Sequence, residues 1–375
     1  MPDEPRRTSL GDHTRLPSIR TVAERAGVSP STVSRVLRAD SYVSAATRER
    51  VLRAVQELEY EPHFAARSLR SRSSKMVGVV IQDVTNPFYS FMAKGIAEVM
   101  RRSGLVLLLS DSEEEREREA ESLRVMLRAR VDGLVITPTA GNADVLQLLQ
   151  RQRVAIVQVD RTIPGVLSDT VLIDNYGGAY AATRHLIQLG HREIGVVAGP
   201  QSLTTGRERL AGFRAAMRDS GVPVSEEHVK ISDFRRESAY LLAGELLSAS
   251  PRPRALFAQN NALVEGVLAV VRERGYHVPR DLAVLGFDDP PWAELASPPL
   301  TVVRQPAQTI GVTAAELLVR RMRDRESDPS PTHIVIAPTL VVRGSCGDVP
   351  DAHARGLVTS GQESAFVGRS RDDAS

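Results

Sequence analysis

The stretch SIRTVAERAGVSPSTVSRVLRADSYVSAATRERVLRAVQELEYEPHFAARSLRSRSSK, residues 18–75, decides the fold of the first part of the chain. Its first apolar pattern has helical spacing up to Gly27, a residue that ends a helix at little steric cost. Ser29 and Pro30 begin a second pattern, because the serine oxygen can cap free amides and the proline ring fixes a helical φ. Ser44 caps a third. The stretch therefore predicts three helices around one small core.

The first two helices, joined by a tight turn with a glycine, form a helix-turn-helix, whose second helix lies in the major groove of DNA. Arg35 can pair with guanine through two hydrogen bonds, and the serines can bind bases or phosphates. The alternative is an ordinary helical hairpin with solvated polar residues. The net charge favours the DNA-binding interpretation, because residues 18–75 carry a net charge of +5 whereas the whole chain carries only +2. The candidate groove residues are Ser29, Pro30, Ser31, Ser34 and Arg35.

Three segments, AERAGVSPSTVSRVL, YVSAATRERV and LEYEPHFAARSL, resemble the DNA-binding domain and hinge helix of the LacI/GalR family of bacterial transcription regulators. The resemblance implies that a leucine, Leu69 by position, enters the minor groove. Such an apolar wedge unstacks a base step and bends the duplex. The family usually has Asn at the positions of Arg38 and His63, so we expect different hydrogen bonds there. The further candidates for DNA contact are Arg38, Tyr42, Ser44, Thr47, Tyr60, His63, Ala66 and Leu69.

After residue 75, short apolar runs alternate with longer helical patterns. Buried runs of Val, Ile and Leu separated by helices are typical of parallel strands with right-handed crossovers. The runs form two series, which predict two doubly wound α/β lobes. The predicted strands are 76–81, 105–110, 131–137, 154–159, 193–199, 254–258 and 282–287. The resemblance implies the same architecture, a two-lobed core like that of periplasmic binding proteins, in which the chain crosses between lobes near 172–174, 304–307 and 334–337.

Ligands of open α/β sheets bind at the carboxyl ends of strands, so polar and aromatic residues just after each run are candidates for an effector pocket. A charged or amide side chain in a closing cleft needs a partner, and a polyol or heterocycle offers several. The family's effector contacts, carried over by position, imply most of the same set. The candidates are Phe88, Tyr89, Asp160, Arg207, Arg209, Phe234, Asn260, Asp288 and Gln305.

Several of these assignments have alternatives. Arg207 and Arg209 could instead brace the helix that follows them, and we interpret Asp289 as structural. Family members commonly have Asp after the pocket asparagine, whereas this chain has Asn261, which removes a negative charge from the edge of the cleft and leaves the type of effector open. The acidic run DSEEEREREAES, residues 111–122, is interpreted as the solvated start of a helix, where carboxylates suit the positive end of the dipole.

The remaining composition limits the class of protein. A single Cys346 excludes an internal disulfide framework, and no apolar run reaches the roughly 20 residues of a membrane helix. His185 and His191 lack the spacing of paired metal ligands, so neither a metal nor another cofactor is expected. No nucleophile elbow or phosphate-binding glycine loop indicates an enzyme. The polar amino terminus has no signal peptide, so we expect a cytoplasmic, nucleoid-associated protein.

These features predict a DNA-binding transcription regulator, a repressor, controlled by a small effector between the lobes. We expect a sugar, with a purine or other non-sugar corepressor as the alternative. A transport solute-binding protein shares the core but needs an export signal and no DNA module. The expected partners are double-stranded DNA with a near-palindromic operator, the effector and a second copy in a homodimer, with no membrane. The expected segments are a disordered arm (1–17), the helix-turn-helix domain (18–62), a hinge helix (63–75), the two-lobed domain (76–344) and a disordered tail (345–375).

Overall fold

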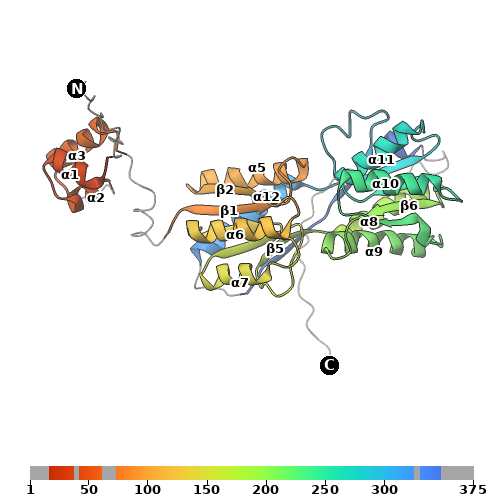
Figure 1. Ribbon diagram of the computed structural model, residues 1–375, viewed down its shortest axis with the longest axis horizontal. Coiled ribbons are helices and arrows are strands. Elements are labelled where there is room, and N and C mark those ends of the chain that lie inside the picture. Colours follow the sequence, from red (N-terminus) through yellow and green to blue (C-terminus); the bar gives the residue numbers. More distant parts are fainter. Residues whose placement is uncertain (1–16, 38–41, 61–72, 325–329, 348–375) are drawn as a thin grey trace, which may run out of the picture. The chain divides into compact units, whose positions relative to one another are not determined.

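The computed structural model describes residues 17–37, 42–60, 73–324 and 330–347. It divides into two units, Met1–Lys75 and Met76–Ser375, which are treated separately below (Figure 1). The predicted fold class is confirmed, since one unit is helical and the other is built on two largely parallel sheets. Within the described part of the chain, no helix is long and apolar enough to cross a membrane. The expectations for Arg38, His63, Ala66, Leu69, the hinge segment up to residue 72, the arm up to residue 16 and the tail after residue 347 lie outside the described residues.

The first unit contains the three predicted helices, α1 (Ile19–Ala26), α2 (Pro30–Leu37) and α3 (Ala45–Glu57). Gly27 ends α1 in the left-handed conformation, with a φ of 63°. The Ser44 side chain accepts a hydrogen bond from the first turn of α3, so its predicted capping role is also confirmed. The apolar faces meet in one core, whose fully buried members are Val22, Val33 and Val51.

Lobe 1 of the second unit is built on a six-stranded parallel sheet with the order β11-β5-β4-β3-β1-β2. Helices α5 and α12 pack on one face of this sheet, and α6 and α7 pack on the other (Figure 1). The strands are β1 (Met76–Ile81), β2 (Val106–Asp111), β3 (Gly133–Ile136), β4 (Ala155–Val159), β5 (Asp169–Ile173) and β11 (His333–Ile336). The helices are α5 (Pro87–Arg102), α6 (Arg116–Ala129), α7 (Ala143–Arg151) and α12 (Ala307–Arg323).

Lobe 2 repeats this plan with the strand order β12-β10-β9-β8-β6-β7, in which only the β10–β12 pair is antiparallel. Helices α8 and α9 cover one face of the sheet, and α10 and α11 cover the other. The strands are β6 (Ile194–Ala198), β7 (Val229–Ile231), β8 (Ala255–Ala258), β9 (Ala283–Phe287), β10 (Thr301–Arg304) and β12 (Thr339–Val341). The helices are α8 (Asn175–Gln188), α9 (Thr204–Asp219), α10 (Arg236–Ser248) and α11 (Asn261–Glu273).

The chain passes between the lobes at the three predicted places. Asp174 joins β5 to α8, residues 305–306 join β10 to α12, and residues 337–338 join β11 to β12. All seven predicted strands are present, with ends that differ by at most two residues. Strands β5, β7, β10, β11 and β12 were not predicted. Among these, β7, β11 and β12 lie at sheet edges, where half-exposed side chains interrupt the apolar pattern.

The predicted start of the tail at residue 345 is wrong. Residues Gly344–Cys346 form a short 3₁₀ helix, and Ser345 and Cys346 are 0% and 1% exposed. The Ser345 hydroxyl accepts a hydrogen bond from the backbone of Thr301 at 2.8 Å and donates one to the carbonyl of Val284. These bonds attach the segment to two neighbouring strands of lobe 2. Burial raises the pKa of the Cys346 thiol to about 11, so the thiol stays protonated.

Candidate functional site

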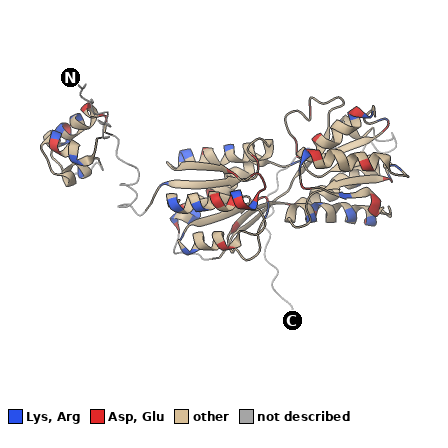
Figure 2. Cartoon of the chain, in the orientation of Figure 1, with Lys and Arg blue, Asp and Glu red and all other residues tan. Residues whose placement is uncertain are grey.

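The predicted groove residues lie together at the start of α2. Ser29, Pro30, Ser31 and Arg35 are exposed, and Ser34 is half-buried. The Ser29 hydroxyl accepts a hydrogen bond from the backbone of Thr32, which fixes the first turn of the helix. Figure 2 shows several Lys and Arg on this unit. The arrangement offers an exposed helix start with hydroxyl and guanidinium donors, the groups that bind bases and phosphates.

The other described DNA candidates divide into two kinds. Tyr42 is 94% exposed, Ser44 is exposed and Thr47 is half-buried, so all three have solvent-accessible surface with which to contact DNA. Tyr60 differs, because it is only 7% exposed and packs in the core of the three helices. Its burial argues against the predicted DNA contact and gives the residue a structural role instead.

A cavity lies where the carboxyl ends of the strands of both lobes meet. Eight of the nine predicted effector residues line it: Phe88, Tyr89, Asp160, Arg209, Phe234, Asn260, Asp288 and Gln305. They come from segments far apart in the sequence, and each lies at or just after the carboxyl end of a strand or in the first turns of the following helix. This convergence follows from the parallel sheets, whose carboxyl ends share one edge.

Arg207 is the exception. It lies on α9, two residues before Arg209. Residues two apart on a helix point to different sides, so Arg207 and Arg209 do not face the same way. Its side chain is exposed and donates hydrogen bonds to the carbonyls of Gln201 and Ser202, at 3.2 and 3.1 Å. Arg207 therefore has a structural role and does not line the cavity, but it braces the loop before α9, not the helix itself as the alternative interpretation held.

Lobe 1 contributes a wall of paired charges. The Arg161 guanidinium, 2% exposed, forms two hydrogen bonds with the carboxylate of Glu114, at 2.9 and 3.0 Å. It also donates to the hydroxyl of Tyr89 at 3.0 Å and to Asp160 at 3.3 Å. Burial disfavours the charged form of Arg161, but the interactions with Glu114, Tyr89 and Asp160 outweigh this effect and raise its pKa. The partners fix this cation in place.

Lobe 2 contributes Arg209, which is 3% exposed. It donates to the side chain of Asn175 at 2.8 Å and to the carbonyl of Gln259 at 2.7 Å. The guanidinium lies 3.8 Å from the centre of the Phe287 ring, within the range of a cation–π interaction. Burial lowers the pKa of Arg209, and the nearby carboxylate of Asp288 opposes this effect.

Asp288 forms the floor of the cavity in lobe 2. Its carboxylate accepts hydrogen bonds from Gln305 at 2.5 Å and from the backbone of Asn261 at 3.2 Å. Burial raises the pKa of Asp288, although Arg209 and Gln305 oppose the rise. Gln305 belongs to one of the segments that cross between the lobes, so its hydrogen bond connects Asp288 in the cavity to that crossing segment.

Two buried polar atoms at the cavity have no partner among the described residues. They are the hydroxyl of Thr205, on a residue 2% exposed, and the side-chain oxygen of Gln305, on a residue 8% exposed. Buried polar groups are nearly always hydrogen-bonded, because a missing partner is costly. Both atoms belong to residues that line the cavity, so a bound molecule could supply the partners.

Three lining residues, Asp160, Phe234 and Asp288, have left-handed backbone, with φ of 65°, 65° and 75°. Such values are uncommon for residues other than glycine, and strain of this kind is concentrated at binding sites. Each residue lies in a turn that follows a strand, where the conformation directs its side chain toward the cavity.

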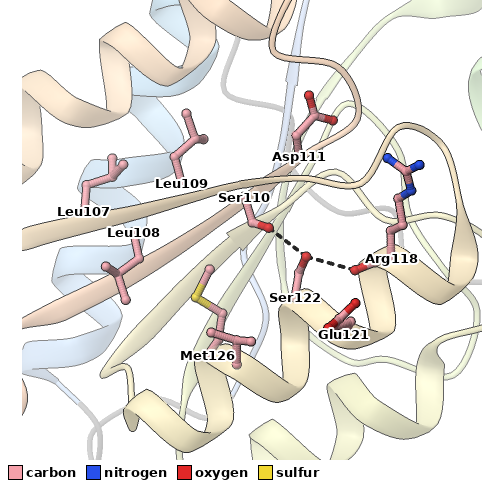
Figure 3. A pocket seen from close by; sticks show the side chains of 10 residues that line it. Leu107, Leu108, Leu109, Ser110, Asp111, Arg118, Glu121, Ser122 and Met126 are labelled. Carbon is pink, nitrogen blue, oxygen red and sulfur yellow. Dashed lines mark hydrogen bonds between the residues drawn. The ribbon is translucent and has the colours of Figure 1, made fainter.

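A larger groove, of about 630 Å³, lies between β2 and α6. Figure 3 shows that it is lined by leucines of β2, by Met126 of α6 and by charged residues, Asp111, Arg118 and Glu121. The hydroxyls of Ser110 and Ser122 share a hydrogen bond of 2.7 Å. No predicted effector residue lines it. The polar convergence that marks a small-molecule site is in the cavity between the lobes, so we assign the site there.

Comparisons with known proteins agree with this architecture. Residues 18–63 match the bacterial regulatory proteins of the lacI family, and residues 183–346 match the periplasmic binding protein-like domain. The HTH-type transcriptional repressor PurR of Photobacterium profundum is 34% identical over 335 residues, which cover 89% of this chain and 100% of that protein. The chain belongs to the lacI family. It is a DNA-binding repressor of that family, and its relatives are transcriptional repressors, not enzymes.

Two similar solved structures of transcription regulators cover most of the chain. The transcriptional regulator CelR in complex with cellobiose is 34% identical with a TM-score of 0.67, covering 88% of this chain and 99% of that one. The lac repressor dimer bound to operator and the anti-inducer ONPF is 26% identical with a TM-score of 0.75, covering 89% and 100%.

Six lining residues of this lacI-family repressor lie outside the nine predicted effector contacts: Asp83, Asn86, Glu114, Arg161, Thr205 and Ala262. Two of them, Asn86 and Arg161, follow the first and fourth predicted strands and are pocket candidates by the strand-end argument. Glu114 belongs to the acidic run 111–122, which was interpreted as a solvated helix start. That interpretation is incomplete, because Glu114 pairs with Arg161 and Glu119 is fully buried, accepting a hydrogen bond from the backbone of Thr139.

Asp289 is structural, as predicted. It forms ion pairs with Arg304 at 2.6 Å and with Arg343 at 2.8 Å. Burial opposes its ionisation, but hydrogen bonds from Arg343 and Arg304 outweigh this and lower the pKa of Asp289. Within the described ranges, the structure contains no group of three or more His, Cys, Asp or Glu placed to hold a metal ion.

Proposed function

We propose that this repressor binds a neutral polyhydroxylated molecule, a sugar, in the cavity between its lobes, and that this ligand controls its affinity for operator DNA. The observation that carries the proposal is the lining itself. It combines buried carboxylates, two buried arginines, side-chain amides and unpartnered polar atoms within one cavity at the strand ends. Such convergent polar groups with a few aromatic faces are typical of small-molecule sites.

The charges of the lining favour a neutral ligand. Four carboxylates, of Asp83, Glu114, Asp160 and Asp288, line the cavity together with two guanidinium groups, of Arg161 and Arg209. The charge of Arg161 is already matched by Glu114 and Asp160. An anionic ligand such as a sugar phosphate would therefore meet a net negative wall, and in a desolvated site that repulsion is costly.

The hydrogen-bonding capacity of the lining favours hydroxyl groups. Asp160, Asp288 and the free oxygen of Gln305 are acceptors, whereas Arg209 and the hydroxyl of Thr205 can donate. A sugar hydroxyl can both donate and accept, so it can satisfy both kinds of group. Phe88 and Phe234 add flat apolar faces. The similarity to CelR, whose structure contains cellobiose, supports the same class of ligand.

We propose that the chain acts as a homodimer on a near-palindromic operator. Strands β2 and β7 each form one edge of their sheet, and Val106, Leu109 and Ile231 on them are 47%, 44% and 44% exposed. Open strand edges with apolar side chains are normally covered. The lac repressor structure similar to this chain is a dimer on its operator. Twofold symmetry then requires two half-sites, one for each helix-turn-helix.

The ligand would act by linkage. It can change operator affinity only if it binds more tightly to one arrangement of the lobes than to another. The three crossing segments allow such a change, and Gln305, at one of these segments, is bonded to Asp288 in the cavity. Ligand binding would therefore change the relative arrangement of the two lobes, and with it the affinity of the helix-turn-helix units for operator DNA.

A thermal-shift screen tests the ligand class. The purified protein would be heated with neutral mono- and disaccharides, with sugar phosphates and with purine nucleobases, alone and with operator DNA selected from a random duplex library. We expect a neutral sugar to raise the unfolding midpoint and to change the affinity for the selected operator. A shift with purines alone would contradict the sugar proposal and favour the alternative, while a shift with sugar phosphates alone would contradict the charge argument.

Arg35→Ala tests the DNA-reading surface. If Arg35 reads a base through two hydrogen bonds, its loss should cost about 1–3 kcal/mol at the selected operator and relax the preference for that sequence. Fluorescence anisotropy with operator and with random DNA measures both quantities. Arg53→Ala, on an exposed arginine of α3 that pairs with Glu49, is the control. An equal loss on both DNAs would show that Arg35 contacts only phosphate.

A further inference from the structure

The two lobes are joined by a reciprocal pair of side-chain amides. Asn86 precedes α5 in lobe 1, and Asn261 is the first residue of α11 in lobe 2. The Asn86 amide nitrogen donates to the Asn261 oxygen at 3.1 Å, and the Asn261 amide nitrogen donates to the Asn86 oxygen at 2.9 Å. Each amide thus gives and accepts one hydrogen bond across the interface between the lobes.

The orientation of both amides is fixed by the backbone. The Asn86 oxygen also accepts from the backbone N–H of Phe88 at 3.0 Å, and the Asn261 oxygen accepts from that of Ala262 at 2.9 Å. A backbone N–H can only donate, so the atom that faces it must be the oxygen. Each amide nitrogen is therefore left to face the oxygen of the other asparagine, and the pairing is determined by the two helix starts.

The pair is also connected to the cavity. Asn86 lines it, and the backbone N–H of Asn261 donates to the Asp288 carboxylate at 3.2 Å. Asn261 is 3% exposed, so its bonds are formed with little competition from water. This contact joins the lobes in addition to the three crossing segments, which by themselves leave hinge motion possible.

We propose that Asn86 and Asn261 form an amide latch that holds the two lobes in the arrangement that encloses the cavity. The latch depends on asparagine at both positions, because each amide supplies a donor and an acceptor on two separate atoms that reach across the interface. An aspartate at position 261 would keep the oxygen that accepts from the backbone of Ala262 but lose the donor to Asn86. The latch sets the balance between closed and open lobes whatever the identity of the ligand, so it does not rest on the sugar proposal.

A double-mutant cycle tests the latch in the full-length protein. In Asn86→Ser and Asn261→Ser, the hydroxyl can still accept from the nearby backbone N–H, but it is too short to bridge the lobes. Spin labels on cysteines introduced at Arg151 in lobe 1 and Glu227 in lobe 2, both exposed, would report the distance between lobes. Cys346 is 1% exposed and would stay unlabelled.

We expect each single variant to raise the open-to-closed ratio roughly tenfold, because two hydrogen bonds are lost together. The double variant should resemble either single variant, since the second change removes nothing further. Distance distributions equal to the wild type in all variants, or additive effects of the two changes, would overturn the latch.

A second variant protects the test against failure of the serine variants to fold. Asn86→Asp combined with Asn261→Asp keeps the oxygens that accept from the backbone of Phe88 and Ala262 and places two carboxylates against each other. Their repulsion should open the lobes further at pH 7 and relax when the carboxylates are protonated at low pH. Lobes that stay closed at pH 7 in this folded variant would equally overturn the proposal.

Discussion

The two walls of the cavity differ in how far their polar groups are satisfied without a ligand. In lobe 1, the cation of Arg161 is held by Glu114, Asp160 and Tyr89. In lobe 2, the hydroxyl of Thr205 has no partner among the described residues, and neither has the oxygen of Gln305, the residue that carries the chain back to lobe 1. The charges of the lobe 1 wall are thus paired within that lobe, whereas lobe 2 presents groups that need a partner.

This difference assigns different tasks to the lobes. A wall whose charges are internally paired is rigid and gains little from a ligand, so it serves mainly to shape the cavity. A wall with buried unpartnered atoms gains the most when a ligand supplies the missing hydrogen bonds. We therefore expect the residues of lobe 2 to determine ligand affinity and the charge network of lobe 1 to determine stability.

The largest effect is expected for Arg209→Ala. The change removes a buried cation that lies against Phe287 and neighbours Asp288, and hydrogen bonds to charged groups contribute about 1.5–3 kcal/mol. Affinity for the ligand found in the screen should fall about 100-fold in isothermal titration calorimetry. Arg207→Ala, an exposed arginine two residues earlier, is the control and should bind normally. Equal losses in both variants would mean that lobe 2 does not read the ligand through Arg209.

The next effect concerns lobe 1. Glu114→Gln removes the main counter-charge of Arg161, and an unpaired buried cation is costly. Because the Glu114 side chain is 30% exposed, we expect a loss of about 1–2 kcal/mol in the free energy of unfolding, measured by urea denaturation. Glu115→Gln, whose carboxylate pairs with the exposed Arg118, should change stability by less than about 0.5 kcal/mol. Comparable effects would remove the distinction between the walls.

The smallest effect separates binding from stability. Thr205→Val removes an unpartnered hydroxyl while keeping the shape of the side chain, so the free protein should lose no stability. Ligand affinity should fall about fivefold if the hydroxyl bonds to the ligand. Thr137→Val is a matched control, because the Thr137 hydroxyl is also buried and unpartnered but does not line the cavity. If Thr137→Val weakened binding as much, Thr205 would have no special role.

Much of the site could be predicted from the sequence because strand ends are easy to locate in an open α/β fold. Apolar runs give the strands, and the residues that follow them must meet at one edge. Phe88, Asp160, Asn260 and Asp288, which this reasoning selected, line the cavity. It could not separate Arg207 from Arg209, because the direction of each side chain depends on where α9 begins.

The remaining errors concern partners that are distant in sequence. Glu114 and Glu119 lie in a run of charges that resembles a solvated surface, and their buried partners come from other loops. Ser345 lies in a polar carboxyl-terminal segment, yet its hydroxyl completes hydrogen bonds between strands of lobe 2. Tyr60 could be assigned to DNA or to the core, and only packing decides for the core.

The most direct test of the central claim is the reciprocity between ligand and operator. Ligand affinity would be measured by calorimetry with and without operator, and operator affinity by anisotropy with and without ligand. If the cavity controls DNA binding, both ratios must differ from one in the wild type, and linkage requires that they be equal. In Asp288→Ala, operator binding should be retained but no longer respond to the ligand. A normal response in Asp288→Ala, or a ligand that leaves operator affinity unchanged in the wild type, would contradict the proposal.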